Sequence, residues 1–453
     1  MPRRLVVPAL FALTACTPTA VPFETPTRSV APAVSTTLPR SSAPIASGTA
    51  SVLRSNASIA RDFMALSFAL ESGTQVPRLT RFSGPITVRL SGQLPGTAGS
   101  DLSALLARLR SEARIDIHQS TGGPANILIE GIPRAEINRF VPNAACFVAP
   151  EVSGLADYQR ARRNGLTSWA TMASRTKMTI FVPSDASPQE TRDCLHEELA
   201  QALGPLNDLY SLSDSVFNDD NVHATLTDFD MLILRIYYDP MLQNGMTAAE
   251  VQGRLPYILR RLNPAGEGLA TAPQYYLPDT WAQEIATALR AGTTPTARIR
   301  AAERAVALVN THGVKDTRAG FSYFVLGRVT MAHSAQQSRR AFENADRLYA
   351  ALPDSRLQRA FVATQLAAFA LTQGKADTAL GMVRPYLQTA RDAENAALLA
   401  TLMLLEAEAL DLKGVSSQAR SVRLDSMGWA RYGFGSEQAV QARLREIAAL
   451  SPG

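Results

Sequence analysis

One segment, residues 193–208, combines a histidine, several carboxylates and a glutamine in the order DCLHEELAQALGPLND. A zinc-binding helix of the peptidase type carries two ligands four residues apart, and a Glu after the first ligand activates metal-bound water. When this pattern starts at His196, the second ligand position is Ala200, which offers no atom to a metal. The first register therefore lacks a ligand.

A second register starts one residue later, at Glu197. It places Gln201 at the second ligand position and Gly204 where such motifs turn the chain. Asp208 then lies near the third ligand position, and Glu198 takes the position of the general base. The geometry of this register is better, but the neutral amide of Gln201 is a poor ligand for zinc. The sequence thus predicts a degenerate zinc-peptidase motif.

Two interpretations of these side chains remain open. In the catalytic interpretation Glu198 is the general base. Glu197 then holds a divalent metal together with Gln201 or Asp208, and a hard ion such as calcium or magnesium suits these oxygen ligands. In the structural interpretation the same groups hydrogen-bond neighbouring segments and need no cofactor. The incomplete motif favours the structural interpretation.

Two histidines are additional candidates for the site. His196 directly precedes Glu197, but adjacent helix positions point about 100° apart, so both reach one cleft only at a distorted helix end. His223 follows the polar stretch NDDNV at 218–222. That stretch either supplies a ligand or forms a solvated loop, and we expect the loop.

The N-terminus predicts export and lipid attachment. Two arginines precede an apolar run at 5–13, which is too short to span a bilayer and is typical of a signal peptide. The run ends in LTAC at 13–16, which resembles the lipobox of bacterial lipoproteins. Residues 1–16 are therefore predicted to be a signal peptide with lipidation at Cys16. Thr17, in place of Asp, resembles signals for the outer membrane of Gram-negative cells, facing the periplasm.

Residues 17–56 are predicted to form a disordered tether. They are rich in Pro, Ser, Thr and Ala and hold too few large apolar groups to offset chain entropy. Cys146 and Cys194 are the other two cysteines. In an oxidising compartment a disulfide between them is the economical interpretation, and two buried thiols are the alternative.

Residues 57–290 mix strand and helix patterns and predict an α+β domain. The expected strands and helices lie at 86–90, 102–114, 115–118, 126–129, 177–182 and 188–203. The last helix has the clearest start, because a Ser, a Pro and a Glu occupy positions 187, 188 and 190. We expect this motif-bearing helix to end at Gly204.

Residues 294–450 carry no strand signal and are predicted to be an all-helical domain. Its helices are separated by expected breaks near Gly320, Pro353, Gly374, Asp392 and Gly414. Alanines recur at spacings of 38 and 40 residues, at Ala341, Ala379 and Ala419. These spacings resemble the helix pairs of tetratricopeptide-like repeats, which usually bind a partner protein. A plain helical bundle is the alternative.

Several motifs within 110–265 resemble bacterial lipoproteins that carry the domain of unknown function numbered 2927. The matching features are Cys194 before EExxQxxG, the Asn-Asp that follows, SVFND at 215–219, LRIYYDP at 234–240 and GMT at 245–247. That family is grouped with zincin-like peptidase folds. The resemblance implies a small mixed sheet with a motif-bearing helix, and it implies no activity.

The charge and the domain order of the chain narrow the range of possible functions. The net charge of +5 is carried by scattered arginines, which gives no support for nucleic-acid binding. We expect a membrane-anchored envelope lipoprotein with a non-catalytic zincin-like domain, which binds or scaffolds a protein partner through its helical repeats. The alternative is a divergent, metal-dependent envelope peptidase or amidase.

The predicted lipid anchor is testable by one substitution. Cys16→Ser removes the thiol that would carry the lipid, so the variant should appear in the soluble fraction of cells while the native chain sediments with membranes. Immunoblotting of the separated fractions measures this. A Cys16→Ser chain that still sediments with membranes after a salt wash would refute the anchor.

Overall fold

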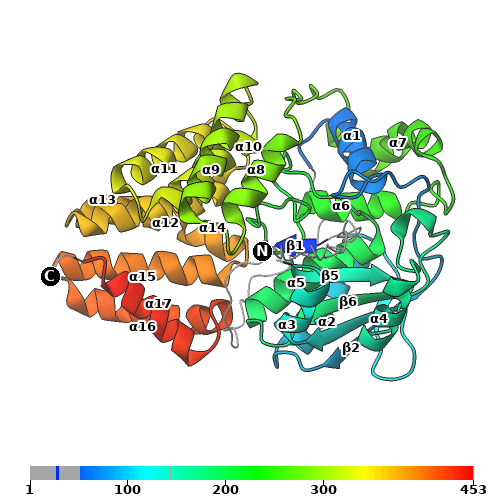
Figure 1. The fold of residues 1–453 in the computed structure, drawn as a ribbon, viewed down its shortest axis with the longest axis horizontal. Coiled ribbons are helices and arrows are strands. Elements are labelled where there is room, and N and C mark those ends of the chain that lie inside the picture. The colour runs from blue at the N-terminus through cyan, green and yellow to red at the C-terminus, as the bar shows by residue number, and fades with distance from the viewer. Residues whose placement is uncertain (1–26, 30–51, 143, 452–453) are drawn as a thin grey trace, which may run out of the picture.

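The computed structural model describes residues 27–29, 52–142 and 144–451. The predicted signal peptide, Cys16 and most of the predicted tether lie outside the described residues. The chain forms an α/β half, which ends with helix α7, and a helical half, which consists of α8–α17 (Figure 1). The prediction of an α+β fold followed by an all-helical region is confirmed.

The described strands form one mixed sheet in the order β1-β5-β6-β4-β2-β3. Neighbours among β2, β3, β4 and β6 are parallel, whereas β5 is antiparallel to both β6 and β1. The strands are β1 (Thr27–Ser29), β2 (Ile86–Gly92), β3 (Ile117–Gln119), β4 (Ile127–Ile132), β5 (Ala144–Pro150) and β6 (Met178–Pro183). β1 lies inside the predicted tether, and its backbone pairs with β5.

Seven α-helices accompany the sheet in the described part of the α/β half. They are α1 (Asn56–Ser67), α2 (Ala98–Ser111), α3 (Arg134–Phe140), α4 (Leu155–Arg163), α5 (Pro188–Leu203), α6 (Asp228–Tyr237) and α7 (Ala248–Leu262). The strands and helices expected from apolar periodicity are present, with ends that shift by a few residues. α5 has the predicted bounds.

The sheet is covered on both faces, and β5 shows how one strand serves two cores. Cys146 and Val148 pack in the larger core beneath α2 and α5. Phe147 and Ala149 point the opposite way and pack in a second core with α3 and α4. A strand that is buried on both faces has an unbroken apolar sequence. The sequence of β5, AACFVAP, has this character and is buried along its whole length.

A disulfide joins Cys146 in β5 to Cys194 in α5, as predicted. Their Cα atoms lie 6.1 Å apart, and both residues are 0% exposed. The bond therefore attaches the motif-bearing helix to the sheet beneath it.

The helical half is a stack of antiparallel helices. They are α8 (Thr280–Leu289), α9 (Pro295–Thr311), α10 (Thr317–Thr330), α11 (Ala335–Ala350), α12 (Arg356–Thr372), α13 (Ala376–Val383), α14 (Leu387–Asp392), α15 (Ala396–Leu412), α16 (Ser416–Gly433) and α17 (Glu437–Ala448). α8 precedes the predicted boundary at 294, yet Trp281 and Ile285 pack in one core with α9 and α10. The helical layer thus begins at α8.

The recurring alanines are all buried. Ala341, Ala379 and Ala419 are at most 3% exposed and lie in the cores between helices. The expected break near Gly320 is wrong, because Gly320 lies inside α10. A Cβ at this position would lie 2.6 Å from the ring of Tyr349, so glycine serves close helix packing there and does not end a helix.

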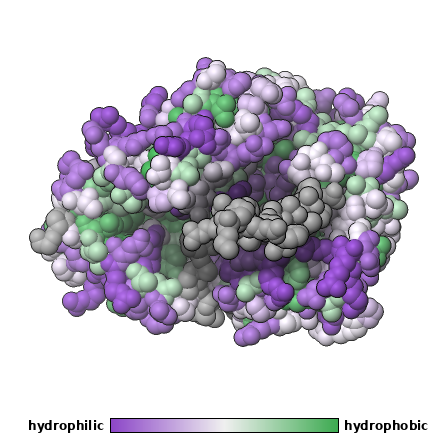
Figure 2. Space-filling view, viewed as in Figure 1, coloured by the Kyte–Doolittle hydropathy of each residue, from purple (hydrophilic) through white to green (hydrophobic). Residues whose placement is uncertain are grey.

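Apolar side chains are scattered over the face shown in Figure 2, as is normal for folded proteins. Among the described residues, none of the helices is both long enough and apolar enough to traverse a bilayer.

The contact at Gly320 predicts a stability change. Gly320→Ala forces its methyl group against the buried ring of Tyr349, so we expect the free energy of unfolding to fall by about 1–3 kcal/mol. Gly381→Ala in α13 is the matched control, because a Cβ there meets no atom within 4 Å. The control should be neutral or more stable by up to about 1 kcal/mol. Urea denaturation compares the two, and equal effects would contradict the packing role.

Candidate functional site

Helix α5 carries the predicted motif, and local contacts set both of its ends. Ser187 Oγ accepts a hydrogen bond from the Glu190 amide (2.8 Å), and Pro188 occupies the first turn. Gly204 follows the last turn because a Cβ there would lie 2.8 Å from the ring of Tyr237 in α6. Packing against α6 therefore positions the C-terminal part of α5, where the motif lies.

A buried cation, Arg175, caps this end of α5. Its Nη1 donates to the carbonyl oxygens of Gln201 (2.5 Å) and Ala202 (2.8 Å), and its guanidinium lies over the ring of Trp169 at 5.2 Å. Positive charge at a helix C-terminus interacts favourably with the helix dipole. Arg175 is 2% exposed, and burial lowers its pKa. The sequence analysis missed this residue, which no local motif marks.

The motif side chains themselves are buried. Glu197 is 5% exposed, and Glu198 and Gln201 are 0% exposed. Gln201 Nε2 donates a hydrogen bond to Asp208 Oδ2 at 3.3 Å, which places the predicted second and third ligands side by side. The structure thus brings Gln201 and Asp208 together, and the charge of Glu197 acts on Asp208.

A cluster of carboxyl groups surrounds Asp208. Burial raises the pKa of Asp208 well above its usual range, and the nearby charges of Glu71, Asp219 and Glu197 raise it further. No Lys or Arg of the described residues forms an ion pair with Asp208 or Asp219. Carboxyls in this environment retain protons, because a proton replaces the missing cation.

The geometry of this cluster does not form a metal site. Within residues 27–29, 52–142 and 144–451, no three His, Cys, Asp or Glu side chains are placed to hold one metal ion. In the predicted set, the amide nitrogen of Gln201 points to Asp208 and is hydrogen-bonded to it. A metal would need oxygens from both side chains. Gln201 acts here as a hydrogen-bond donor.

The loop at 204–227, which we name the wedge loop, follows α5 and enters the helical half. The ring of Tyr210 packs edge-on against Trp281 at 5.0 Å, and Val222 lies in the core formed by α12, α13 and α15. Gln358 of α12 donates a hydrogen bond to the carbonyl oxygen of Ser213 at 2.7 Å. The wedge loop therefore joins the two halves.

The polar stretch 218–222 is part of the wedge loop and is not a solvated loop. Asn218 is 5% exposed, and its Nδ2 donates to Asp220 Oδ2 at 3.1 Å. Burial raises the pKa of Asp219 to about 6 and that of Asp220 to about 7. The expectation of a solvated stretch is corrected, because these side chains hydrogen-bond one another and the backbone between the two halves.

Both candidate histidines hydrogen-bond the backbone. His196 Nδ1 accepts from the Leu226 amide at 3.0 Å, so it orders the end of the wedge loop. His223 Nε2 lies 2.9 Å from the carbonyl oxygen of Ser213 and is therefore the donor. Burial lowers the pKa of His223, which favours the neutral ring.

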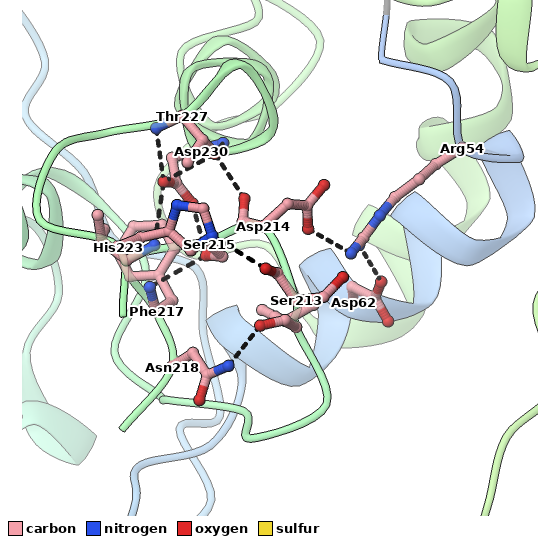
Figure 3. Close-up of polar contacts among 12 residues, drawn as sticks. Arg54, Asp62, Ser213, Asp214, Ser215, Phe217, Asn218, His223, Thr227 and Asp230 are labelled. Carbon is pink, nitrogen blue, oxygen red and sulfur yellow. Dashed lines mark hydrogen bonds and ion pairs between the residues drawn. The ribbon is translucent and has the colours of Figure 1, made fainter. Parts of the chain in front are cut away.

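Figure 3 shows the polar network that holds the wedge loop. Asp230 at the start of α6 accepts hydrogen bonds from Ser215 Oγ (2.5 Å) and from the Thr227 amide (2.8 Å). Arg54 forms ion pairs with Asp62 and with Asp214, and so links the loop to α1. Every labelled group in this network has a structural partner.

The N-terminal part of α5 binds the helical half directly. Gln189 Nε2 donates to Asn395 Oδ1 (3.1 Å), and its Oε1 accepts from the Ala397 amide (2.8 Å) at the start of α15. Arg192 Nη2 donates to the carbonyl oxygen of Glu394 (2.6 Å), and its guanidinium lies over the ring of Tyr432 in α16 at 5.4 Å. α5 therefore contacts the sheet, the wedge loop and the helical half.

The acids of the wedge loop predict a pH dependence of stability. The pKa values of Asp219 and Asp220 are raised above 3.8, so the folded protein keeps protons that the unfolded chain has lost. Their contribution to stability is complete below about pH 4 and is lost as the pH rises through about 6 to 7. The double variant Asp219→Asn with Asp220→Asn should lose less stability between about pH 5 and pH 8, by about 1–3 kcal/mol.

Urea denaturation at several pH values measures this difference. Asp425→Asn is the control, since Asp425 is an exposed acid on α16 and should leave the pH profile unchanged. Equal slopes for the native chain and the double variant would show that these acids are not protonated in the folded state.

Of the two halves, only the α/β half matches a known protein family. No curated protein and no solved structure matches the chain. Residues 56–257 match the model of a family described as "Protein of unknown function (DUF2927)". The match runs from the start of α1 into α7 and contains all of α5 and the wedge loop. The part of the chain that carries the candidate site is thus similar to this family of unknown function.

Proposed function

We propose that the chain is a lipid-anchored protein of the cell envelope, whose zincin-like half is non-catalytic and whose helical half binds a partner protein. The observation that carries this proposal is the use of the α5 side chains. Gln189, Arg192 and His196 hold the helical half and the wedge loop, and Gln201 donates to Asp208. Because these side chains of α5 hold other segments of the protein, they favour a scaffold function over a catalytic one.

The lack of solvent access to the motif also favours a scaffold function over a catalytic one. Hydrolysis needs a general base beside an open site that admits substrate and water. Glu198 is 0% exposed and Glu197 is 5% exposed. The peptidase alternative would therefore require a rearrangement that opens the motif, whereas the adjacent wedge loop is held by Asp230, Arg54 and Gln358.

The helical half suits a partner protein. Its paired helices bury the recurring alanines and leave polar outer faces, as in α11, where Arg340 is exposed and Ala341 is buried. Repeat helices of this kind offer an extended surface to a second chain. The tight joint to α5 fixes that surface relative to the anchored half.

Metal content separates the two functions. The full chain and the double variant Glu197→Gln with Glu198→Gln are purified without chelator, and their metal content is measured by mass spectrometry. We expect no stoichiometric metal that depends on these two residues. A stoichiometric metal in the native chain that is lost in the double variant would support the peptidase.

Cross-linking in cells tests the scaffold. A photo-reactive amino acid at Arg340 of α11 should give one discrete cross-linked protein, and the same label at Arg163 of α4 serves as the control position. The cross-link should persist when Glu198 is replaced by Gln, because partner binding does not use the motif. Loss of the cross-link in Glu198→Gln would contradict a non-catalytic role.

A further inference from the structure

The short strand β1 belongs to the predicted tether, yet it is also part of the sheet. It begins at Thr27, eleven residues after Cys16, and it pairs antiparallel with β5 at one edge of the sheet (Figure 1). β1 also contacts α5. The description of the chain continues at Val52, just before α1. The predicted tether is therefore attached to the α/β half at β1 as well as at Val52.

The edge that receives β1 is the part of β5 that carries the disulfide. Residues 144–147 of β5 lie opposite β1, whereas residues 147–150 pair with β6. Arg28 lies opposite Cys146, whose bond to Cys194 attaches this part of β5 to α5. The disulfide and β6 thus hold the edge from within the α/β half. The edge stays in position whether or not β1 is paired with it.

The pairing of β1 is short and irregular. β1 has three residues, and its register shifts between Arg28 and Ser29. Such a shift leaves backbone groups out of the hydrogen-bonded ladder. By comparison, β4 and β6 pair over six residues in one register. Because few ladder bonds hold β1, it can leave the edge while the centre of the sheet stays paired.

The state of β1 limits how far the α/β half can lie from Cys16. A chain spans at most about 3.3–3.6 Å per residue. With β1 paired, eleven residues join Cys16 to Thr27, so the sheet edge lies within about 40 Å of Cys16. With β1 released, 36 residues join Cys16 to Val52, which span up to about 130 Å. Release of β1 therefore raises this limit about threefold.

We propose that β1 is a reversible clasp that sets the distance between the membrane and the folded protein. The clasp rests on the proposed lipid anchor at Cys16. When β1 is paired it holds the α/β half near the bilayer, and when it is released the protein reaches farther out. Gln189 and Arg192 join α5 to the helical half, so the helical half moves with the sheet. The clasp thus determines how far from the membrane the partner-binding half lies.

Two double variants separate strand pairing from tether composition. Thr27→Pro with Arg28→Pro removes two adjacent N–H groups, and one of any two adjacent N–H groups in an antiparallel edge strand points to its neighbour. Ser35→Pro with Thr36→Pro makes the same change in the predicted tether outside β1. Melting temperatures confirm that both chains are folded.

Hydrogen exchange of β5 tests the pairing without a membrane. Each chain also carries Cys16→Ser. We expect exchange within residues 144–147 to be at least about tenfold faster in Thr27→Pro with Arg28→Pro than in the native sequence, and unchanged in the control. Exchange within β6 should be the same in all three chains. Equal exchange of β5 in all three would show that β1 does not cover the edge, and would overturn the clasp.

Energy transfer to a labelled bilayer measures the reach of the lipidated chain. A donor dye is attached through Arg139→Cys in α3, a helix that packs on β5, where the arginine side chain is 70% exposed. The chains are reconstituted in phosphatidylcholine vesicles that contain an acceptor lipid. Transfer efficiency should fall at least about twofold in Thr27→Pro with Arg28→Pro, because the distance limit rises, and should stay native in the control.

The outcomes distinguish the clasp from the anchor. Equal transfer efficiency in three chains that all bind the vesicles would overturn the clasp and leave the lipid anchor intact. A native chain that does not remain on the vesicles would refute the anchor at Cys16 and the clasp with it. Binding of all three chains, with reduced transfer in the β1 variant alone, would support both.

Discussion

Burial of α5 along its whole length determines how the rest of the protein is organised. Polar groups taken out of water destabilise a fold unless they find partners, and α5 carries many of them. Its apolar residues, such as Leu195 and Leu199, pack on the sheet. Its polar residues reach the carbonyls and amides of other segments, as Gln189 and Arg192 do in the helical half. The two halves and the loop between them are therefore parts of one packing arrangement centred on a single helix.

The burial of α5 also explains why the side chains of its motif interact with other protein groups. A helix buried on every side presents its carboxylates to other protein groups, and burial raises the pKa values of the nearby acids Asp208 and Asp219. A hydrogen bond from Gln201 to Asp208 replaces what would be two metal ligands in a zinc-peptidase motif. The geometry thus favours a structural use of residues whose spacing resembles that of a catalytic site.

Features encoded by neighbouring residues could be predicted from the sequence, whereas those that depend on distant contacts could not. The start of α5 was predictable because the cap, the proline and the glutamate are adjacent. Gly320 was misjudged because Tyr349, a residue of the next helix, is what requires a glycine there. The burial of the stretch 218–222 was not predictable, since a run of polar residues is typical of solvated loops, whereas Val222 packs in a core of the helical half. The disulfide was predictable because Cys146 and Cys194 are the two cysteines that remain besides Cys16 in a chain predicted to be exported.

The bond between Cys146 and Cys194 also bears on when the protein can fold. Both sulfurs lie in the core between the sheet and α5, where no oxidant reaches them once the core has closed. Oxidation must therefore precede or accompany the docking of α5 on β5. In a reducing cytoplasm the chain would lack this link, whose removal typically destabilises a domain by about 2–5 kcal/mol. Under the export that we propose, such a chain would stay easier to unfold before it leaves the cytoplasm, which suits passage through a translocation channel that admits only unfolded polypeptide.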